Sequence, residues 1–203
     1  HERDLHGGRA AAACPLRRSR FSPGLRMHAP TLTPTPEAAA PAPALLPFEL
    51  VCPAGSLPAL KAAVDNGASC VYLGLRDATN ARNFAGLNFD EAAIASGIAY
   101  AHAKGCKVFM ALNTYPQAAN PAPWRAAVDK AVDLGVDAVI LADPGLMQYA
   151  AQHHPKLRLH LSVQGSATSA DAINFYREQF GVVRAVLPRV LSMEQVRRVI
   201  DRT

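Results

Sequence analysis

The residues best suited to chemistry gather between positions 75 and 89, in the segment "LRDATNARNFAGLNF". The segment contains Arg82, the amides Asn80 and Asn83, and the aromatic Phe84. A guanidinium presents a planar fork of donors, so Arg82 could hold a carboxylate or a phosphate. The neighbouring amides could orient polar atoms of a ligand. The same side chains could equally pin the segment to its neighbours, and the sequence leaves both roles open.

Three further candidates follow apolar runs elsewhere in the chain. Asp143, in "ADPG", is better suited to a turn than to the role of a catalytic carboxylate, and both roles stay open. Gln164 suits either a site wall or structural pinning, because a buried amide needs partners. Arg189 comes after Pro188, where an anionic ligand or an ion pair explains a charge better than solvation does. We expect Arg82 and Arg189 to converge on one cavity that takes a small anionic or aromatic substrate.

The sequence lacks the motifs of several kinds of catalytic and metal site. The sequence has no HExxH, no GxSxG, no phosphate-binding P-loop and no paired-cysteine motif. Its four cysteines are scattered, so we expect small buried thiols rather than a metal or iron–sulfur ligand set. The cysteines are Cys14, Cys52, Cys70 and Cys106. No metal ligands and no catalytic residue are assigned.

Short apolar runs alternate with amphipathic segments from residue 49 onward. Four of the amphipathic segments close at a glycine, and Ser56 and Asp90 are suited to begin two of the helices. Strands are predicted at Glu49–Cys52, Cys70–Gly74, Val108–Asn113, Ala138–Ala142, Arg158–Val163 and Arg184–Leu187.

The alternation predicts an α/β fold with a parallel sheet, because runs such as "AVILA" suit strands buried on both faces. A dinucleotide-binding sheet would place GxGxxG after the first strand, where this chain has "CPAGS". The prediction is therefore a TIM-barrel-like (β/α) domain with six of eight units present. Function in such barrels gathers at the carboxyl ends of the strands, where every candidate residue lies.

The charge distribution divides the chain at about residue 48. Residues 1–48 hold six arginines against three acids and are rich in Pro and Ala, which predicts a disordered tail. Residues 49–203, the predicted N-terminal portion of the barrel, hold fifteen basic and thirteen acidic residues. This near-neutral balance gives no reason to expect nucleic acid as a partner. No run of about 18 apolar residues exists, so no membrane span is expected.

Five segments resemble one known family. They are "ELVCPAGSLPALKAAVDNGASCVYLGL", "TNARNFAGLNF", "ILADPGL", "LHLSVQGSAT" and "VLPRVLSMEQV". Together they resemble the collagenase-like peptidase family of unassigned catalytic type, and within it the UbiU-like branch of ubiquinone biosynthesis. The resemblance runs in register from Glu49 to Ile200. Substrate-pocket roles carry over to the matching positions Asn80, Arg82, Asn83, Phe84, Asp143, Gln164 and Arg189.

The resemblance implies a cytoplasmic iron–sulfur protein for oxygen-independent hydroxylation of the ubiquinone ring. It implies a heterodimer with a UbiV-like sister subunit. It also implies a [4Fe-4S] cluster on four cysteines beyond the segment that matches residues 49–203. We therefore expect this chain to bind no cluster and to be inactive alone. Two alternatives stay open, a collagenase-like peptidase and a non-catalytic docking subunit.

Overall fold

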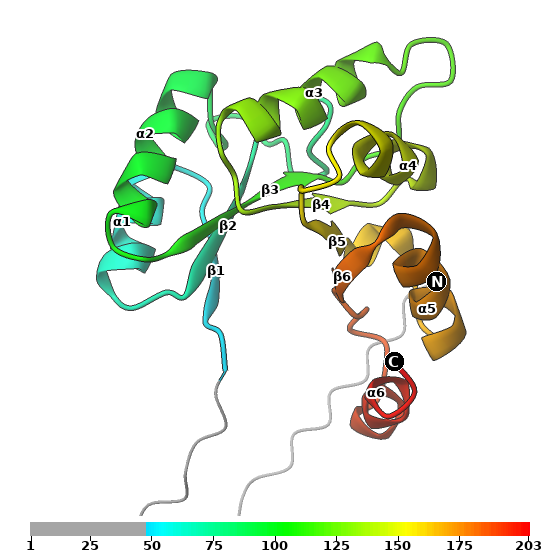
Figure 1. The fold of residues 1–203 in the computed structure, drawn as a ribbon. Coiled ribbons are helices and arrows are strands. Elements are labelled where there is room, and N and C mark those ends of the chain that lie inside the picture. The colour runs from blue at the N-terminus through cyan, green and yellow to red at the C-terminus, as the bar shows by residue number, and fades with distance from the viewer. Residues whose placement is uncertain (1–47) are drawn as a thin grey trace, which may run out of the picture. The chain divides into compact units, whose positions relative to one another are not determined.

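The computed structural model describes residues 48–203, and the fold is built on one six-stranded sheet (Figure 1). All neighbouring strands are parallel, and their order in the sheet is their order in the chain. The strands are β1 (Val51–Pro53), β2 (Cys70–Gly74), β3 (Lys107–Leu112), β4 (Ala138–Leu141), β5 (Leu159–Leu161) and β6 (Val182–Ala185). The six predicted strands are confirmed, with Cys70–Gly74 unchanged and the ends of the others shifted by at most two residues.

A helix follows each strand. The helices are α1 (Leu57–Asp65), α2 (Glu91–His102), α3 (Ala122–Asp133), α4 (Pro144–His153), α5 (Ala170–Phe180) and α6 (Met193–Ile200), with a 3-10 turn η1 at Val163–Gly165. Ser56 and Asp90 begin their helices as predicted, because each side chain accepts a hydrogen bond from a backbone N–H three residues later. Gly181 ends α5 at a φ of 71°, a conformation that glycine adopts without strain.

The topology distinguishes a barrel-like sheet from a doubly wound one. A doubly wound sheet reverses its strand order at a switch point and carries helices on both faces. Here the order never reverses, and the helices lie on one side of the sheet (Figure 1). One main core joins the helices to alternate strand residues such as Val108, Met110 and Leu112. The TIM-barrel-like prediction is confirmed.

The opposite face of the sheet carries a second, smaller cluster. Cys70, Phe109 and Ala138 are buried there, with Tyr72 and Ile140 packed against them. His160 meets Phe109 edge-to-face, with ring centroids 4.8 Å apart. These residues occupy alternate positions to those of the main core, as the pleat requires, so they form the inner face of the sheet.

An ion-pair cluster joins the first and last strands across that inner face. Glu49, two residues before β1, accepts hydrogen bonds from Arg184 of β6 and from Lys107 of β3. The two cations lower the pKa of the Glu49 carboxyl, with Arg184 contributing most. Since β1 and β6 are the two edge strands, this contact requires a strongly curved sheet.

The predicted disordered tail lies outside the described residues, apart from Phe48. Within residues 48–203, no helix is long and apolar enough to cross a membrane.

Candidate functional site

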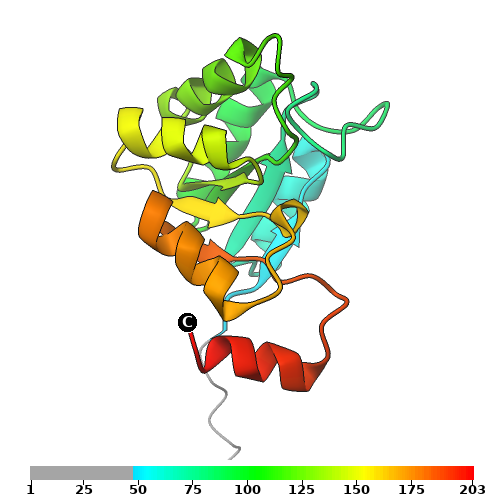
Figure 2. The ribbon, with the colours of Figure 1, turned by 90° about the vertical axis from the view of Figure 1, so that its right-hand side faces the viewer.

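The loop after β2 is fixed by a return path beside the strand end. Leu75 and Phe89 pair in parallel, and the Phe89 N–H donates to the Gly74 carbonyl at 3.2 Å. The Arg76 N–H donates to the Phe89 carbonyl at 3.0 Å, and Phe89 is fully buried. The residues between are therefore held at the carboxyl ends of the strands, and in Figure 2 they project beyond the sheet.

Asn80 anchors the inside of this loop. Its side chain is 6% exposed, its Nδ2 donates to the Leu75 carbonyl at 3.4 Å, and its Oδ1 accepts from the Arg82 N–H at 3.0 Å. A Cβ at Gly74 would lie 2.3 Å from the Asn80 Nδ2. Glycine at position 74 thus makes room for the amide. Structural pinning, one of the two roles left open by the sequence, accounts for the hydrogen bonds of Asn80.

The end of β3 supplies a second anchor. The Asn113 Oδ1 accepts from the Ala81 N–H at 3.0 Å, and its Nδ2 donates to the Ser162 Oγ after β5 at 3.4 Å. The Thr114 hydroxyl donates to the Ala78 carbonyl at 2.6 Å and accepts from the Trp124 indole N–H at 2.9 Å. The mouths of β2, β3 and β5 are therefore tied into one polar network.

A pocket of about 240 Å³, which we call the strand-mouth pocket, lies beneath the loop. Its walls are the ends of β1, β2 and β3 and the loop itself. The lining residues are Pro53, Ala54, Gly55, Tyr72, Leu73, Gly74, Asn80, Arg82, Phe84, Leu87, Asn88 and Ala111. Three of the seven predicted site residues, Asn80, Arg82 and Phe84, come together here.

Arg82 and Phe84 differ from the amides in being available to a ligand. Phe84 is 61% exposed at the pocket rim. The Arg82 main chain is held, since its carbonyl accepts from the Asn88 Nδ2 at 2.8 Å. Among the described residues, no hydrogen bond or ion pair engages its guanidinium. The backbone is fixed while the functional group is free, which suits ligand capture.

The other four predicted residues lie elsewhere. Asp143 is the N-cap of α4, and its Oδ1 accepts from the Leu146 N–H at 2.7 Å. Gln164 is exposed in η1, where its carbonyl accepts from the Tyr115 hydroxyl at 2.9 Å. Asn83 and Arg189 are exposed and do not line the strand-mouth pocket. The convergence of Arg82 and Arg189 stays a prediction.

Two residues at the site, Tyr72 and Asn113, are not among the seven predicted from the sequence. Tyr72 points from β2 to the inner face and lines the pocket. Asn113 ties the loop to the β5 mouth. Tyr72 could have been found from the strand pattern, because it alternates with the outward-facing Val71 and Leu73. The role of Asn113 depends on which loop crosses it, and the sequence gives no such signal.

The three cysteines of the described residues, Cys52, Cys70 and Cys106, do not form a ligand set. Among residues 48–203, no group of three or more His, Cys, Asp or Glu side chains could hold a metal ion. Burial raises the pKa of both Cys70 and Cys106, which opposes the thiolate form that iron and zinc require. These thiols therefore do not fit a [4Fe-4S] cluster, and they pack in the core as predicted.

His160 is buried on the inner face, below the mouth of β5. Burial, followed by the charges of Arg184 and Arg158, lowers its pKa to about 4. The imidazole is therefore neutral near pH 7, and the site has no histidine cation at this position.

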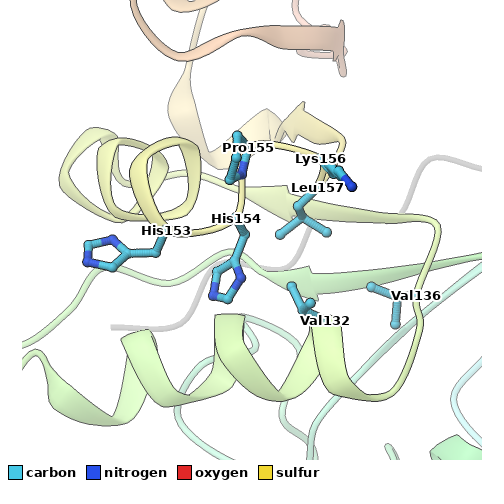
Figure 3. A pocket seen from close by; sticks show the side chains of 7 residues that line it. All are labelled: Val132, Val136, His153, His154, Pro155, Lys156 and Leu157. Carbon is cyan, nitrogen blue, oxygen red and sulfur yellow. The ribbon is translucent and has the colours of Figure 1, made fainter.

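A second cavity, of about 390 Å³, lies on the helical side between α3 and the end of α4 (Figure 3). Its wall is mainly apolar, with Val132, Val136 and Leu157, and the side chains of His153 and His154 lie at its rim. His154 pairs with Asp129 at 2.6 Å, which ties α4 to α3. His153 ends α4 and His154 is its C-cap.

Sequence comparison finds relatives with differing names. Residues 55–203 match the model of peptidase family U32. The tRNA hydroxylation protein P of Escherichia coli is 34% identical over 152 residues, which cover 74% of this chain and 33% of the relative. A collagenase of Porphyromonas gingivalis is 33% identical, covering 75% and 36%. The chain thus spans about a third of the length of these relatives.

Two solved structures share the fold at low sequence identity. The U32 peptidase Mk0906 has a TM-score of 0.63 and 16% identity, covering 76% of this chain and 65% of that one. DHDPS of Cyanidioschyzon merolae has a TM-score of 0.53 and 15% identity, covering 77% of this chain and 60% of that one. Since the family model covers most of the chain, from the β1–α1 turn onward, the chain belongs to peptidase family U32.

Proposed function

We propose that this chain forms the substrate-holding part of a ring hydroxylase, with the strand-mouth pocket as the place where the ring lies. One observation carries the proposal. The pocket joins the Arg82 guanidinium, which has no partner within residues 48–203, to an exposed aromatic ring, Phe84, at the edge of the sheet where barrel enzymes bind substrate. An aromatic face and a cationic fork together suit a planar ring that carries negative charge.

The favoured ring is a pyrimidine base in RNA. The names tRNA hydroxylation protein P and, in Bacillus subtilis, P1 support an RNA substrate. The name 23S rRNA 5-hydroxycytidine C2501 synthase, of an Escherichia coli relative, supports a pyrimidine within it. These relatives are 34%, 31% and 29% identical to this chain. This proposal replaces the expectation of no nucleic acid, which relied on net charge alone.

The ubiquinone ring is the second candidate. The near-neutral balance of residues 49–203 favours it, because a protein that holds RNA normally presents an excess of Lys and Arg. In that case the partner is a UbiV-like sister subunit, as the resemblance implies. Both candidates share the chemistry of adding a hydroxyl group to a planar ring.

We propose that any [4Fe-4S] cluster of the working enzyme is held by cysteines other than Cys52, Cys70 and Cys106. Such a cluster supplies electron transfer. The task of the residues described here is to bind the ring and to orient it.

Peptide cleavage has weaker support, although relatives carry the names collagenase and protease. A nucleophilic peptidase needs a Ser, Thr or Cys hydrogen-bonded to a base. Within residues 48–203, the histidine side chains bond only to Asp137, Asp129 and the Tyr149 carbonyl. A metallopeptidase needs a ligand cluster, which these residues also lack.

The test is deletion of the gene in its own host, followed by mass spectrometry of nucleosides from tRNA and rRNA and of the quinone pool. We expect one pyrimidine nucleoside to lose an oxygen atom while the quinones stay unchanged. A restored wild-type gene should recover the hydroxylated nucleoside. Unchanged nucleosides with accumulated under-hydroxylated quinone precursors would refute the RNA proposal and support the second candidate.

A further inference from the structure

We infer that the strand-mouth pocket is a ring-and-anion site, in which Arg82 holds the anionic group and Phe84 and Tyr72 contact the ring. This inference rests on the proposed function, because a ring hydroxylase must hold a ring. It separates the residues that bind the ligand from those that hold the loop in place.

The hydrogen bonds within the loop separate holding residues from binding residues. Both amide atoms of Asn80 are engaged with the backbone, and the Asn88 Nδ2 donates to the Arg82 carbonyl. These asparagines are positioning residues. In the described part of the chain, no hydrogen bond engages the Arg82 guanidinium or the Tyr72 hydroxyl, so each can meet a ligand.

The placement of these groups defines the shape of the ligand. Tyr72 packs on the inner face of β2 and lines the pocket, and the exposed Phe84 lines it from the loop. A planar ring between them has aromatic contacts, which favour offset or edge-to-face packing. Arg82 lines the same pocket, so its guanidinium can meet a charged group attached to the ring.

The pocket volume suits one enclosed ring. A cavity of about 150 Å³ accommodates benzene. The strand-mouth pocket, at about 240 Å³, therefore holds a single six-membered ring and a few more atoms. Groups attached to the ring can extend past the exposed rim at Phe84. The ligand class is one six-membered ring with a carboxylate or phosphate close by.

Two sources supply this chemistry, a pyrimidine nucleotide unit of RNA and a small cyclic carboxylate. The probes are uridine 5′-monophosphate with its uncharged partner uridine, and benzoate with its uncharged partner benzamide. Binding to the full-length protein is measured by calorimetry. We expect the charged member of one pair to bind about tenfold more tightly than its neutral partner, because a charge-assisted hydrogen bond to Arg82 is gained.

Single-residue variants test which side chain causes the preference for the charged probe. Arg82→Gln should abolish the difference between charged and neutral partners while leaving neutral binding unchanged. Phe84→Ala should weaken both members of the pair to the same degree, and Phe84→Tyr should restore them. Arg198→Gln is the matched control, because Arg198 is an exposed arginine on α6 outside the pocket.

The outcomes distinguish RNA from a small acid as the ligand, and they test the inference separately from the proposed function. A preference for the nucleotide identifies RNA as the source, and a preference for benzoate identifies a small acid. Equal binding of charged and neutral partners, or a preference that survives Arg82→Gln, would overturn the inference. Loss of the hydroxylated nucleoside on gene deletion would still uphold the proposed function. Intact nucleosides with Arg82-dependent binding would uphold the inference alone.

Discussion

Replacing Gly74 by alanine should disturb the fold and the strand-mouth pocket together. The new Cβ would lie 2.3 Å from the Asn80 Nδ2 and 2.5 Å from its Cγ. Ordinary contacts between such atoms begin at about 3.5 Å, so Asn80 must move by about 1 Å. Because that side chain is 6% exposed and bonded at both amide atoms, it has no free space to enter.

The expected cost of Gly74→Ala follows from three contributions. Loss of the two Asn80 hydrogen bonds costs about 2 kcal/mol, at about 1 kcal/mol each. Overpacking adds about 1–3 kcal/mol. The lower backbone entropy of alanine in the unfolded chain returns about 0.5–1 kcal/mol. The free energy of unfolding should fall by about 2–4 kcal/mol.

Urea unfolding measures this change, with Trp124 as the reporter. It is the one tryptophan of the sequence, and its buried indole donates to Thr114 at the edge of the site. Gly55→Ala is the matched control, because the nearest atom to its Cβ would be the Leu87 Cδ2 at 3.5 Å. That control should change stability by less than about 0.5 kcal/mol.

A double-mutant cycle tests the mechanism of the Gly74→Ala effect. In an Asn80→Ala background the clash is absent, so Gly74→Ala should cost much less than in the wild type. If Gly74→Ala is as stable as the wild type, or if its full cost persists without Asn80, the packing argument is wrong.

Three further predictions address other parts of the chain. The pKa of His160 is about 4 in the folded protein and 6.5 in the unfolded chain, so its neutral form contributes full stability above pH 6.5. The free energy of unfolding should fall by up to about 3 kcal/mol as the pH drops to 4. His160→Gln should flatten this part of the pH profile of urea unfolding, and an unchanged profile would refute the prediction. Asn113→Ala should cost about 1–2 kcal/mol and speed proteolysis within residues 75–89, whereas equal protection would show that the loop needs no anchor at β3. β6 is an edge strand with Val183 58% exposed, so the 203-residue chain should self-associate in analytical ultracentrifugation and Val183→Lys should reduce association; a monodisperse wild-type monomer would contradict this.

The architecture could be predicted because its signals are local. Apolar runs such as "AVILA", capping residues such as Ser56 and Asp90, and the closing glycine Gly181 each act within a few residues. The absence of GxGxxG after the first strand then separated a barrel-like sheet from a doubly wound one. Strand ends were less accurate, because they depend on which neighbour continues the hydrogen-bonded ladder.

The division of labour at the site could not be predicted. Asn80 and Arg82 are two residues apart and equally polar, yet one is buried and engaged while the other is free. That difference arises from the return of Phe89 beside Leu75, a tertiary contact. Asp143 followed the local rule for turns and caps α4. Tyr72 lies within a strand rather than at its end, so only the curvature of the sheet brings it to the pocket.

Photo-crosslinking of the full-length protein to tRNA that carries 4-thiouridine tests most directly where the substrate ring lies. Mass spectrometry of the crosslinked peptides identifies the residues in contact with the base. We expect crosslinks to Tyr72 or to residues 75–89, and we expect Phe84→Ala to reduce them. Crosslinks confined to the α3–α4 cavity, with none at the mouth of β2, would contradict the account.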